Sequence, residues 1–322
     1  MAFKRAIVTA VGPLRILIDG DTVAVPFTPK SLIDPATLTV GDVVHANQSG
    51  HRLVVLGRVG GLGLLSGRNL IINSNFMVNQ RGAVSGTSFA TGGYFLDRWL
   101  NPTGGSTTTW ADSGGVRTLT LGDGTGFRYA SQIVEASTLP AGTYTVSWEG
   151  TAELYIFVLN TVYADSPVTF TTDGTAAVNF RFRGNGDTLR NVKLERGSVP
   201  TPYQTASYDD ELRACMRYYQ KVGAEGANYA PLSTAGHQNS STEAYIPVQF
   251  ATPMREVPTC SSGGAISWFG FGVSAACTVS FGEKSRTHVR LDASFSSSGS
   301  GGATGFLRSS DGTGWLAFDA EL

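Results

Sequence analysis

Charged side chains are scarce in this sequence, and neither sign dominates. Lysine, arginine, aspartate and glutamate make up 15% of its 322 residues, and 24 basic against 25 acidic residues leave a formal net charge of -1. A protein that holds a nucleic-acid backbone usually carries a basic surface that neutralises phosphates. The balanced charge therefore argues against nucleic acid as a partner.

Residues that form metal and nucleophile sites are also few. The chain has three cysteines and four histidines, Cys215, Cys260, Cys277, His45, His51, His237 and His288. No CxxC pair, no histidine pair at metal-ligand spacing, no GxSxG turn and no P-loop occurs. Three cysteines cannot form a closed disulfide set, although a bridge between Cys260 and Cys277 stays open. We therefore expect no catalytic residue, no metal and no cofactor.

Long apolar runs are absent. No run reaches the roughly 20 residues of a membrane-spanning helix. The first twenty residues alternate apolar and polar side chains, without the apolar stretch and small-residue cleavage site of a secretory signal. We expect a protein that is made in a cytoplasm, is not exported by secretion and does not insert into membranes.

Glycine and short strand-like runs are abundant instead, and they predict an all-β protein. The chain has 40 glycines, and most apolar runs are four to eight residues long and end at Gly, Asn, Asp or Pro. About five such runs in the first sixty residues predict a small barrel over residues 1–64. A glycine-rich stretch, "GRVGGLGLLSGRN", predicts a connector with a boundary near Leu65.

Two further segments follow this connector. Evenly spaced strands over residues 65–205 predict a jelly-roll β-sandwich. Residues 206–322 begin with a helix and continue with alternating runs such as "AYIPVQF", "HVRLDASF" and "GWLAFDAEL". We expect these runs to form a second, C-terminal β-sandwich.

The helix is predicted by the stretch Ser207–Lys221, "SYDDELRACMRYYQK". Ser207 or Asp209 can cap the first turn, acidic residues lie at this end, and basic residues lie near the other end. One apolar stripe recurs at helical spacing and comprises Leu212, Cys215, Met216 and Tyr219. An isolated helix of this length is marginal in water, so the stripe either covers a sheet of its own chain or forms a seam between identical chains.

Several motifs resemble those of tail fibres from tailed bacteriophages and prophages. The resemblance rests on "NSNFMVNQRG" (Asn73–Gly82), "YFLDRW" (Tyr94–Trp99), "VKLERGSVPTPY" (Val192–Tyr203), "ELRACMRYYQK" (Glu211–Lys221), "YIPVQFATPMREVPT" (Tyr245–Thr259) and "FDAEL" (Phe318–Leu322). The first three are similar to jelly-roll modules related to carbohydrate-binding modules, and the last three to the C-terminal tip domain of such fibres. The first segment resembles the small OB-like barrels with which phage tail proteins attach.

The resemblance implies a function, an assembly and a location. It implies a homotrimer whose seam is the helix stripe. The protein would lie at the tail tip of the virion and attach to tail-tip or baseplate proteins through the first segment. It would bind host surface polysaccharide without catalysis. Related jelly rolls often bind calcium through an acid on the last strand, but here that strand reads "RNVKLE", with Asn191 at this place. Two alternatives stay open, a tailspike-like glycan depolymerase and a purely structural minor tail protein.

Aromatic residues are the candidates for the glycan contacts. Sugars present apolar CH faces that stack on aromatic rings. The candidates are Trp268, Phe269 and Phe271 in "AISWFGFG", Trp110 in "STTTWADSGG" and Tyr229 in "GANYAP". In a strand, at least one ring of the first group must face away from the others. The alternative interpretation is that these rings fill the core or the contacts between subunits.

Overall fold

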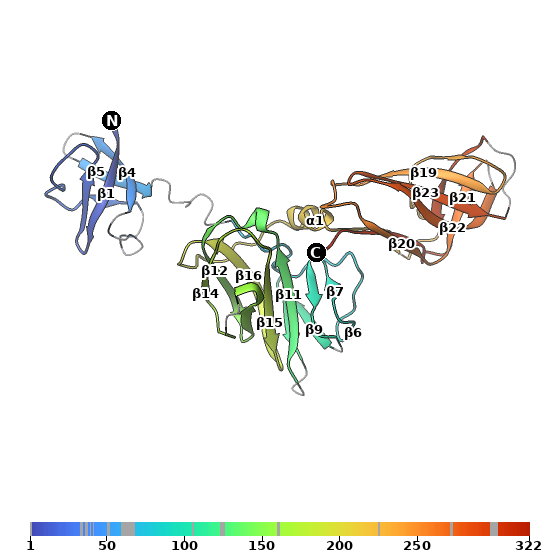
Figure 1. Cartoon of the computed structure of the whole chain (residues 1–322), viewed down its shortest axis with the longest axis horizontal. Helices are drawn as coiled ribbons and strands as arrows, with labels where there is room; N and C mark the ends of the chain where they lie inside the picture. The colour runs from blue at the N-terminus through green and yellow to red at the C-terminus, as the bar shows by residue number, and fades with distance from the viewer. Residues whose placement is uncertain are drawn as a thin grey trace. The chain divides into compact units, whose positions relative to one another are not determined.

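The computed structural model shows an all-β protein with one short α-helix among the residues it describes (Figure 1). The described residues are 2–32, 35, 38, 40, 42–49, 52–58, 68–104, 106–122, 126–159, 162–224, 226–270, 273–296 and 302–322. They form two compact units. The first comprises Met1–Asn69 and Glu195–Thr201, and the second comprises Leu70–Leu194 and Pro202–Leu322.

The first unit contains a five-stranded sheet in the order β2-β1-β4-β5-β3. Its strands are β1 (Ala2–Val11), β2 (Leu14–Ile18), β3 (Lys30–Ser31), β4 (Val43–Ser49) and β5 (Arg52–Arg58). Alternate residues of β2, Leu14, Ile16 and Ile18, are buried, as expected for a strand with one face in a core. The number of strands agrees with the prediction, but no pairing among the described residues joins β2 to β3, so the sheet is not shown to close into a barrel.

The second unit begins with two sheets that share one hydrophobic core. Their orders are β14-β12-β16-β10-β9-β6 and β13-β15-β11-β8-β7. The elements are β6 (Ser88–Phe89), β7 (Gly93–Leu96), β8 (Trp99–Asn101), β9 (Ser106–Ser113), β10 (Val116–Leu121), β11 (Arg128–Val134), η2 (Ala136–Thr138), β12 (Gly142–Gly150), β13 (Glu153–Ile156), η3 (Phe157–Leu159), β14 (Val168–Thr172), β15 (Val178–Gly184) and β16 (Asp187–Arg196). Buried residues from both sheets, including Leu119, Val146 and Phe180, fill the core, so this segment is a β-sandwich.

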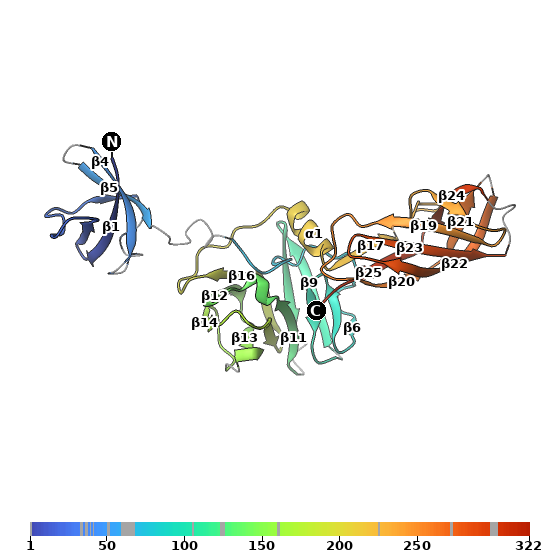
Figure 2. The ribbon, with the colours of Figure 1, turned by 45° about the horizontal axis from the view of Figure 1, so that its top comes forward.

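The C-terminal segment contains a closed barrel rather than the predicted second sandwich (Figure 2). The barrel order is β18-β19-β23-β22-β21-β24, and a separate sheet has the order β17-β25-β20. The strands are β17 (Tyr219–Gly223), β18 (Gly236–Gln238), β19 (Glu243–Gln249), β20 (Thr259–Gly263), β21 (Ile266–Gly270), β22 (Val273–Lys284), β23 (His288–Phe295), β24 (Thr304–Ser309) and β25 (Trp315–Asp319). Because β24 pairs with both β21 and β18, the ring of strands closes.

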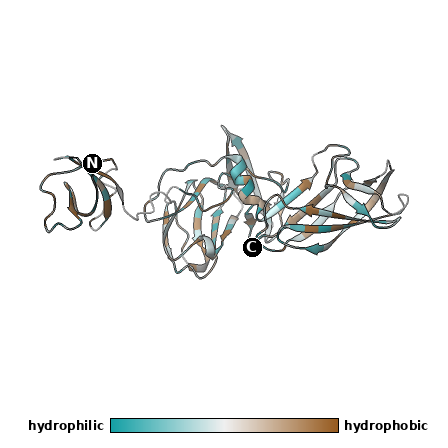
Figure 3. Cartoon of the chain, turned by 90° about the horizontal axis from the view of Figure 1, so that it is seen from above, coloured by the Kyte–Doolittle hydropathy of each residue, from teal (hydrophilic) through white to brown (hydrophobic). Residues whose placement is uncertain are grey.

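The predicted boundaries agree only in part with the two compact units. The first unit ends at Asn69, a few residues beyond the boundary expected near Leu65, which itself lies outside the described residues. No division separates the sandwich from the barrel near residue 205. Hydrophobic and hydrophilic residues alternate along many strands (Figure 3), and this alternation is the same in a sandwich and in a barrel.

The helix α1 (Tyr208–Met216) packs on its own chain, and two residues of the predicted seam are buried there. Cys215 is fully buried, and Tyr219 lies in β17, beyond the end of the helix, with 7% of its surface exposed. Leu212 and Met216 are half-buried. The prediction that all four residues form one helical seam is therefore wrong for Cys215 and Tyr219, because the fold of the single chain already covers them.

Asn73 and Glu211 join the helix to the sandwich. The backbone N–H of Asn73 donates to the Glu211 carboxylate at 2.6 Å. The side chain of Asn73 bonds to the N–H and C=O of Val78 and to the C=O of Asp97, each at 2.9 Å. Asn73 has a φ of 55°, a left-handed conformation that asparagine tolerates better than most residues. The "NSNFMVNQRG" motif thus forms the seat of the helix.

Two arginines, the buried Arg98 and the half-buried Arg81, hold the last residues of the chain. The guanidinium of Arg98 forms an ion pair with Glu321, and both side chains are less than 5% exposed. Arg81 pairs with Glu321 and Asp319, each at 3.2 Å. The Tyr94 hydroxyl donates to the C=O of Leu322 at 3.0 Å. These contacts attach the strand β25 and the residues after it to the sandwich.

Candidate functional site

Two neighbouring strands of the barrel present aromatic rings on its outer surface. In the β21–β24 pair, Trp268 lies opposite Leu307 and Phe269 lies opposite Phe306. Trp268 and Leu307 are fully buried inside the barrel, so Phe269 and Phe306 point to the outer side. Their ring centroids are 5.7 Å apart with planes inclined by 64°, and the two rings make one apolar platform.

Arg308 extends this platform to a third ring. Its guanidinium lies 4.1 Å from the ring centroid of Phe269 and 4.5 Å from that of Tyr229. Such cation–π contacts orient an arginine while leaving N–H groups at its edge. The Nε of Arg308 is buried and has no hydrogen-bond partner in the described part of the chain. The platform therefore combines three rings with one oriented cation.

Tyr229 has a backbone conformation that only the surrounding structure explains. Its φ is 63°, and its side chain is 59% exposed. Its N–H donates to the C=O of Ser309 at 2.8 Å, which ties the turn to the end of β24. A left-handed conformation is unfavourable for a bulky residue and is found where packing or function requires it. Here it places an exposed tyrosine next to Arg308.

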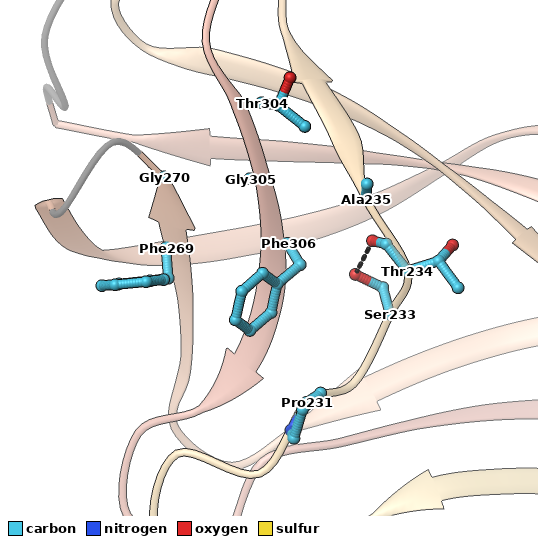
Figure 4. A pocket seen from close by; sticks show the side chains of 9 residues that line it. All are labelled: Pro231, Ser233, Thr234, Ala235, Phe269, Gly270, Thr304, Gly305 and Phe306. Carbon is cyan, nitrogen blue, oxygen red and sulfur yellow. Dashed lines mark hydrogen bonds between the residues drawn. The ribbon is translucent and has the colours of Figure 1, made fainter.

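A pocket of about 410 Å³ lies beside the two phenyl rings (Figure 4). Its lining residues are Pro231, Ser233, Thr234, Ala235, Phe269, Gly270, Thr304, Gly305 and Phe306. Most of this surface is apolar, and three hydroxyl groups are the polar side-chain groups of the lining. The lining has no carboxylate, histidine, cysteine or lysine beside these hydroxyl groups that would activate one of them as a nucleophile.

Hydrogen bonds hold the pocket wall in place. The Ser233 hydroxyl accepts from the N–H of Leu307 at 2.9 Å and donates to the C=O of Thr234 at 3.0 Å. The Thr234 hydroxyl donates to the C=O of Pro247 at 3.3 Å. A second hollow of about 500 Å³ lies along the same wall and shares Pro231, Ser233 and Thr234. The wall is thus bonded to both sides and separates two adjacent hollows.

Glycines on β21 and β24 make room for the indole inside the barrel. A Cβ at Gly305 would lie 2.4 Å from Cζ2 of Trp268, and one at Gly270 would lie 2.9 Å from its Nε1. Both distances are shorter than van der Waals contact. The glycines therefore let Trp268 fill the interior while the same strands present phenyl rings outside.

The five residues predicted to contact a glycan do not form one site in the structure. Phe269 and Tyr229 meet at Arg308, whereas Trp268 is fully buried against Phe295 and cannot contact a ligand outside the barrel. Phe271 lies outside the described residues.

Trp110 has an environment different from the one expected. It lies in strand β9, not in a loop, and packs partly buried against the sandwich core opposite Leu119. Packing against the core therefore explains Trp110 without a ligand.

Sequence reasoning missed Phe306 and Arg308. In "TGFLRS", residues 304, 306 and 308 alternate with the buried residues 305, 307 and 309. This period-2 pattern indicates which side chains point outward. It does not indicate that β24 pairs with β21, so only the fold brings Phe306 and Arg308 next to Phe269.

The described residues include no metal-binding cluster and no helix suited to span a membrane. No group of three or more His, Cys, Asp or Glu residues among the described ones is arranged to hold a metal ion. None of the described helices has the length and apolar character needed to cross a membrane. All three cysteines, Cys215, Cys260 and Cys277, are free thiols, so the open possibility of a bridge between the last two is not realised.

The chain is similar to solved structures at low sequence identity. No family model matches the chain, and no curated protein matches it. A Paenibacillus sp. cycloisomaltooligosaccharide glucanotransferase complexed with cycloisomaltoheptaose is 8% identical over 74% of this chain and 46% of its own, with a TM-score of 0.22. Discoidin II of Dictyostelium discoideum is 10% identical over 67% of this chain and 82% of its own, with a TM-score of 0.19. The chain spans less than half of the glucanotransferase, and no functional argument rests on either match.

Proposed function

We propose that the protein binds a surface glycan without cleaving it, through the outer face of the barrel. The observation that carries this proposal is the platform of Phe269, Phe306 and Tyr229 around Arg308, beside a pocket with hydroxyl groups on its wall. The CH faces of a pyranose ring stack on such rings, and its hydroxyls bond to nearby polar groups. A binding role also agrees with a lining that has no acid or base.

The biological setting follows from the motifs. Because "NSNFMVNQRG", "VKLERGSVPTPY" and "YIPVQFATPMREVPT" resemble segments of phage tail fibres, we propose a receptor-binding tail protein at the tail tip of the virion, made in the host cytoplasm. The first unit would attach to other tail-tip or baseplate proteins. The barrel would recognise polysaccharide on the host cell.

A glycan array with the full chain, followed by calorimetric titration of the best ligand, tests the binding site. Phe306→Ala removes one ring from the platform, and we expect it to weaken binding by about tenfold, as for loss of a stacking contact of about 1.4 kcal/mol. Tyr245→Ala is the matched control, because Tyr245 lies under Arg290 elsewhere on the barrel at 4.8 Å. Equal affinity of Phe306→Ala and the unmodified protein would refute the assignment.

The same preparation distinguishes binding from depolymerisation. We expect no oligosaccharide to be released when the protein is incubated with the polysaccharide it binds. Release that requires a carboxylate side chain would establish the tailspike-like alternative instead. Absence of any glycan binding, together with incorporation into tails, would establish the purely structural one.

We further propose a homotrimer, in which avidity multiplies weak sugar affinity. Leu212 and Met216 are the two stripe residues that the single chain leaves partly exposed. Light scattering of the unmodified protein should give three times the chain mass of 34.0 kDa, and Leu212→Asp with Met216→Asp should lower it to one chain. A monomeric unmodified protein would refute the trimer and leave the helix only its place against its own sandwich.

A further inference from the structure

The outward face of the sheet β13-β15-β11-β8-β7 in the sandwich carries a row of side chains that the barrel site does not involve. Strand registers place Tyr155 opposite Arg181, Arg181 opposite Ser131, and Ser131 opposite Leu100. In β15, Arg181 lies between Phe180 and Phe182, which point inward and are fully buried. The row therefore crosses four strands on the side away from the core.

Three buried polar atoms on this face have no partner among the described residues. They are the Oγ of Ser131, the Nε of Arg181 and the Oδ1 of Asn179. Ser131 is fully buried although it faces outward, and Asn179 lies one row along, opposite Ile133. Leaving a buried donor or acceptor unpaired is costly, and native proteins rarely do so without a reason. Arg181 and Asn179 are only half-buried, so their side chains can offer donors and acceptors to a polar ligand.

Aromatic rings border these polar atoms. The ring centroids of Tyr155 and Tyr163 are 5.2 Å apart with planes inclined by 31°, and those of Tyr155 and Phe157 are 6.2 Å apart. The guanidinium of Arg181 lies 5.0 Å from the Phe157 ring centroid. Phe157 is 53% exposed. An exposed ring beside unpaired hydrogen-bonding groups is the combination that a saccharide requires.

A second arginine is held between two rings on the same face. The guanidinium of Arg183 lies 3.6 Å from the Tyr163 ring centroid and 4.4 Å from that of Phe127. It also bonds to Glu153 at 2.7 Å. Burial raises the pKa of Tyr163, although the neighbouring charges of Arg181 and Arg183 act to lower it. Tyr163 keeps its proton and can donate a hydrogen bond.

The charge of this face selects the class of ligand. Strands β13 and β15 contribute two arginines, Arg181 and Arg183, and one carboxylate, Glu153, to this face. Glu153 bonds to Arg183, so Arg181 has no anionic partner among the described residues. An oriented guanidinium without a carboxylate partner is well suited to bind a carboxylate in a bidentate manner.

We propose that this face of the sandwich is a second binding site, which takes an acidic saccharide. Arg181 binds the carboxylate of a uronic acid residue, the half-buried Asn179 bonds to one of its hydroxyls, and Phe157 stacks on the sugar ring. The site is separate from the barrel platform and does not depend on the function proposed for it.

Calorimetric titration of the full chain with a galacturonic acid trimer tests this site. We expect saturable binding that weakens as salt is added, because an ion pair contributes. Arg181→Gln should weaken binding by about tenfold or more, as for loss of a charge-assisted hydrogen bond. Phe157→Ala should also weaken binding, and it should leave folding intact because Phe157 is more than half exposed. Arg190→Gln is the matched control, since Arg190 lies in β16 of the other sheet and pairs with Glu149 at 2.8 Å.

Further titrations test which ligand group is recognised and which of the two sites binds it. A neutral maltotriose should bind at least tenfold more weakly than the trimer, by the same loss of one charged contact. Phosphorylated glucose distinguishes a carboxylate site from a general anion site, and equal or tighter binding of it would overturn the carboxylate assignment. Phe306→Ala on the barrel should leave uronate binding unchanged. Loss of binding in Phe306→Ala but not in Arg181→Gln, or no binding of the trimer by the unmodified chain, would overturn the proposal while leaving the barrel function to its own test.

Discussion

Replacing Glu211 tests whether a single buried hydrogen bond seats the helix on the sandwich. Glu211 is 7% exposed, and its carboxylate accepts the backbone N–H of Asn73 at 2.6 Å. Glu211→Ala leaves that N–H without a partner, which costs about 1–3 kcal/mol. The carboxylate also lies in the first turn of α1, where the helix dipole favours an anion by about 0.3–1 kcal/mol. The expected loss in the free energy of unfolding is therefore about 1–4 kcal/mol.

Glu211→Gln separates the hydrogen bond from the charge. A glutamine oxygen still accepts the Asn73 N–H, so the loss should stay within about 1 kcal/mol. Burial raises the pKa of Glu211 above its ordinary value of 4.5, although the bonds from Asn73 and Ser74 act in the other direction. The raised pKa stabilises the fold below pH 4.5, and this contribution is lost as pH rises through the folded pKa. Relative to Glu211→Gln, the unmodified protein should therefore gain stability as the solution is acidified.

Differential scanning calorimetry of the three proteins measures both effects. For a unit of this size, a loss of about 1–4 kcal/mol corresponds to a fall of about 2–8 °C in melting temperature. Arg213→Ala, at an exposed position of the same helix, controls for helix propensity and should change little. Equal losses in Glu211→Ala and Glu211→Gln would refute the hydrogen-bond argument, and parallel pH profiles of Glu211→Gln and the unmodified protein would refute the raised pKa.

Three further outcomes follow from buried groups. Trp268→Ala should lower the free energy of unfolding by about 3–5 kcal/mol in chemical denaturation, since it empties the barrel interior, and a loss under 1 kcal/mol would contradict its burial. Glu321→Ala leaves the buried Arg98 guanidinium unpaired and should cost about 3–5 kcal/mol by the same assay, whereas Glu243→Ala at an exposed strand position should not. Burial raises the pKa of the Cys277 thiol to about 11, so it should react slowly with a thiol reagent at neutral pH until the protein is denatured, and rapid reaction of the folded protein would show that it is accessible as thiolate.

Much of the local structure was predictable from the sequence, because strand and helix periods depend on nearby residues. Alternation in "RILI" and "TGFLRS" indicates which side chains enter a core, and Ser207 indicates where the helix begins. The same local patterns identified Phe269 and Tyr229 as candidate ligand contacts. They could not show that the stripe ends early, because Tyr219 leaves the helix to pair with Asp319 in β25.

Tertiary structure decided the closure of the barrel and the composition of both sites. Alternation states which face of a strand is buried, but it does not state which strand lies next to it. Pairing of β24 with β21 and β18 closes the barrel, buries Trp268 and brings Phe306 and Arg308 to Phe269. Pairing of β11 with β15 likewise places Ser131 opposite Arg181. Because these pairings join residues far apart in the chain, the sequence by itself determined the outward-facing residues, and only the fold determined which of them meet.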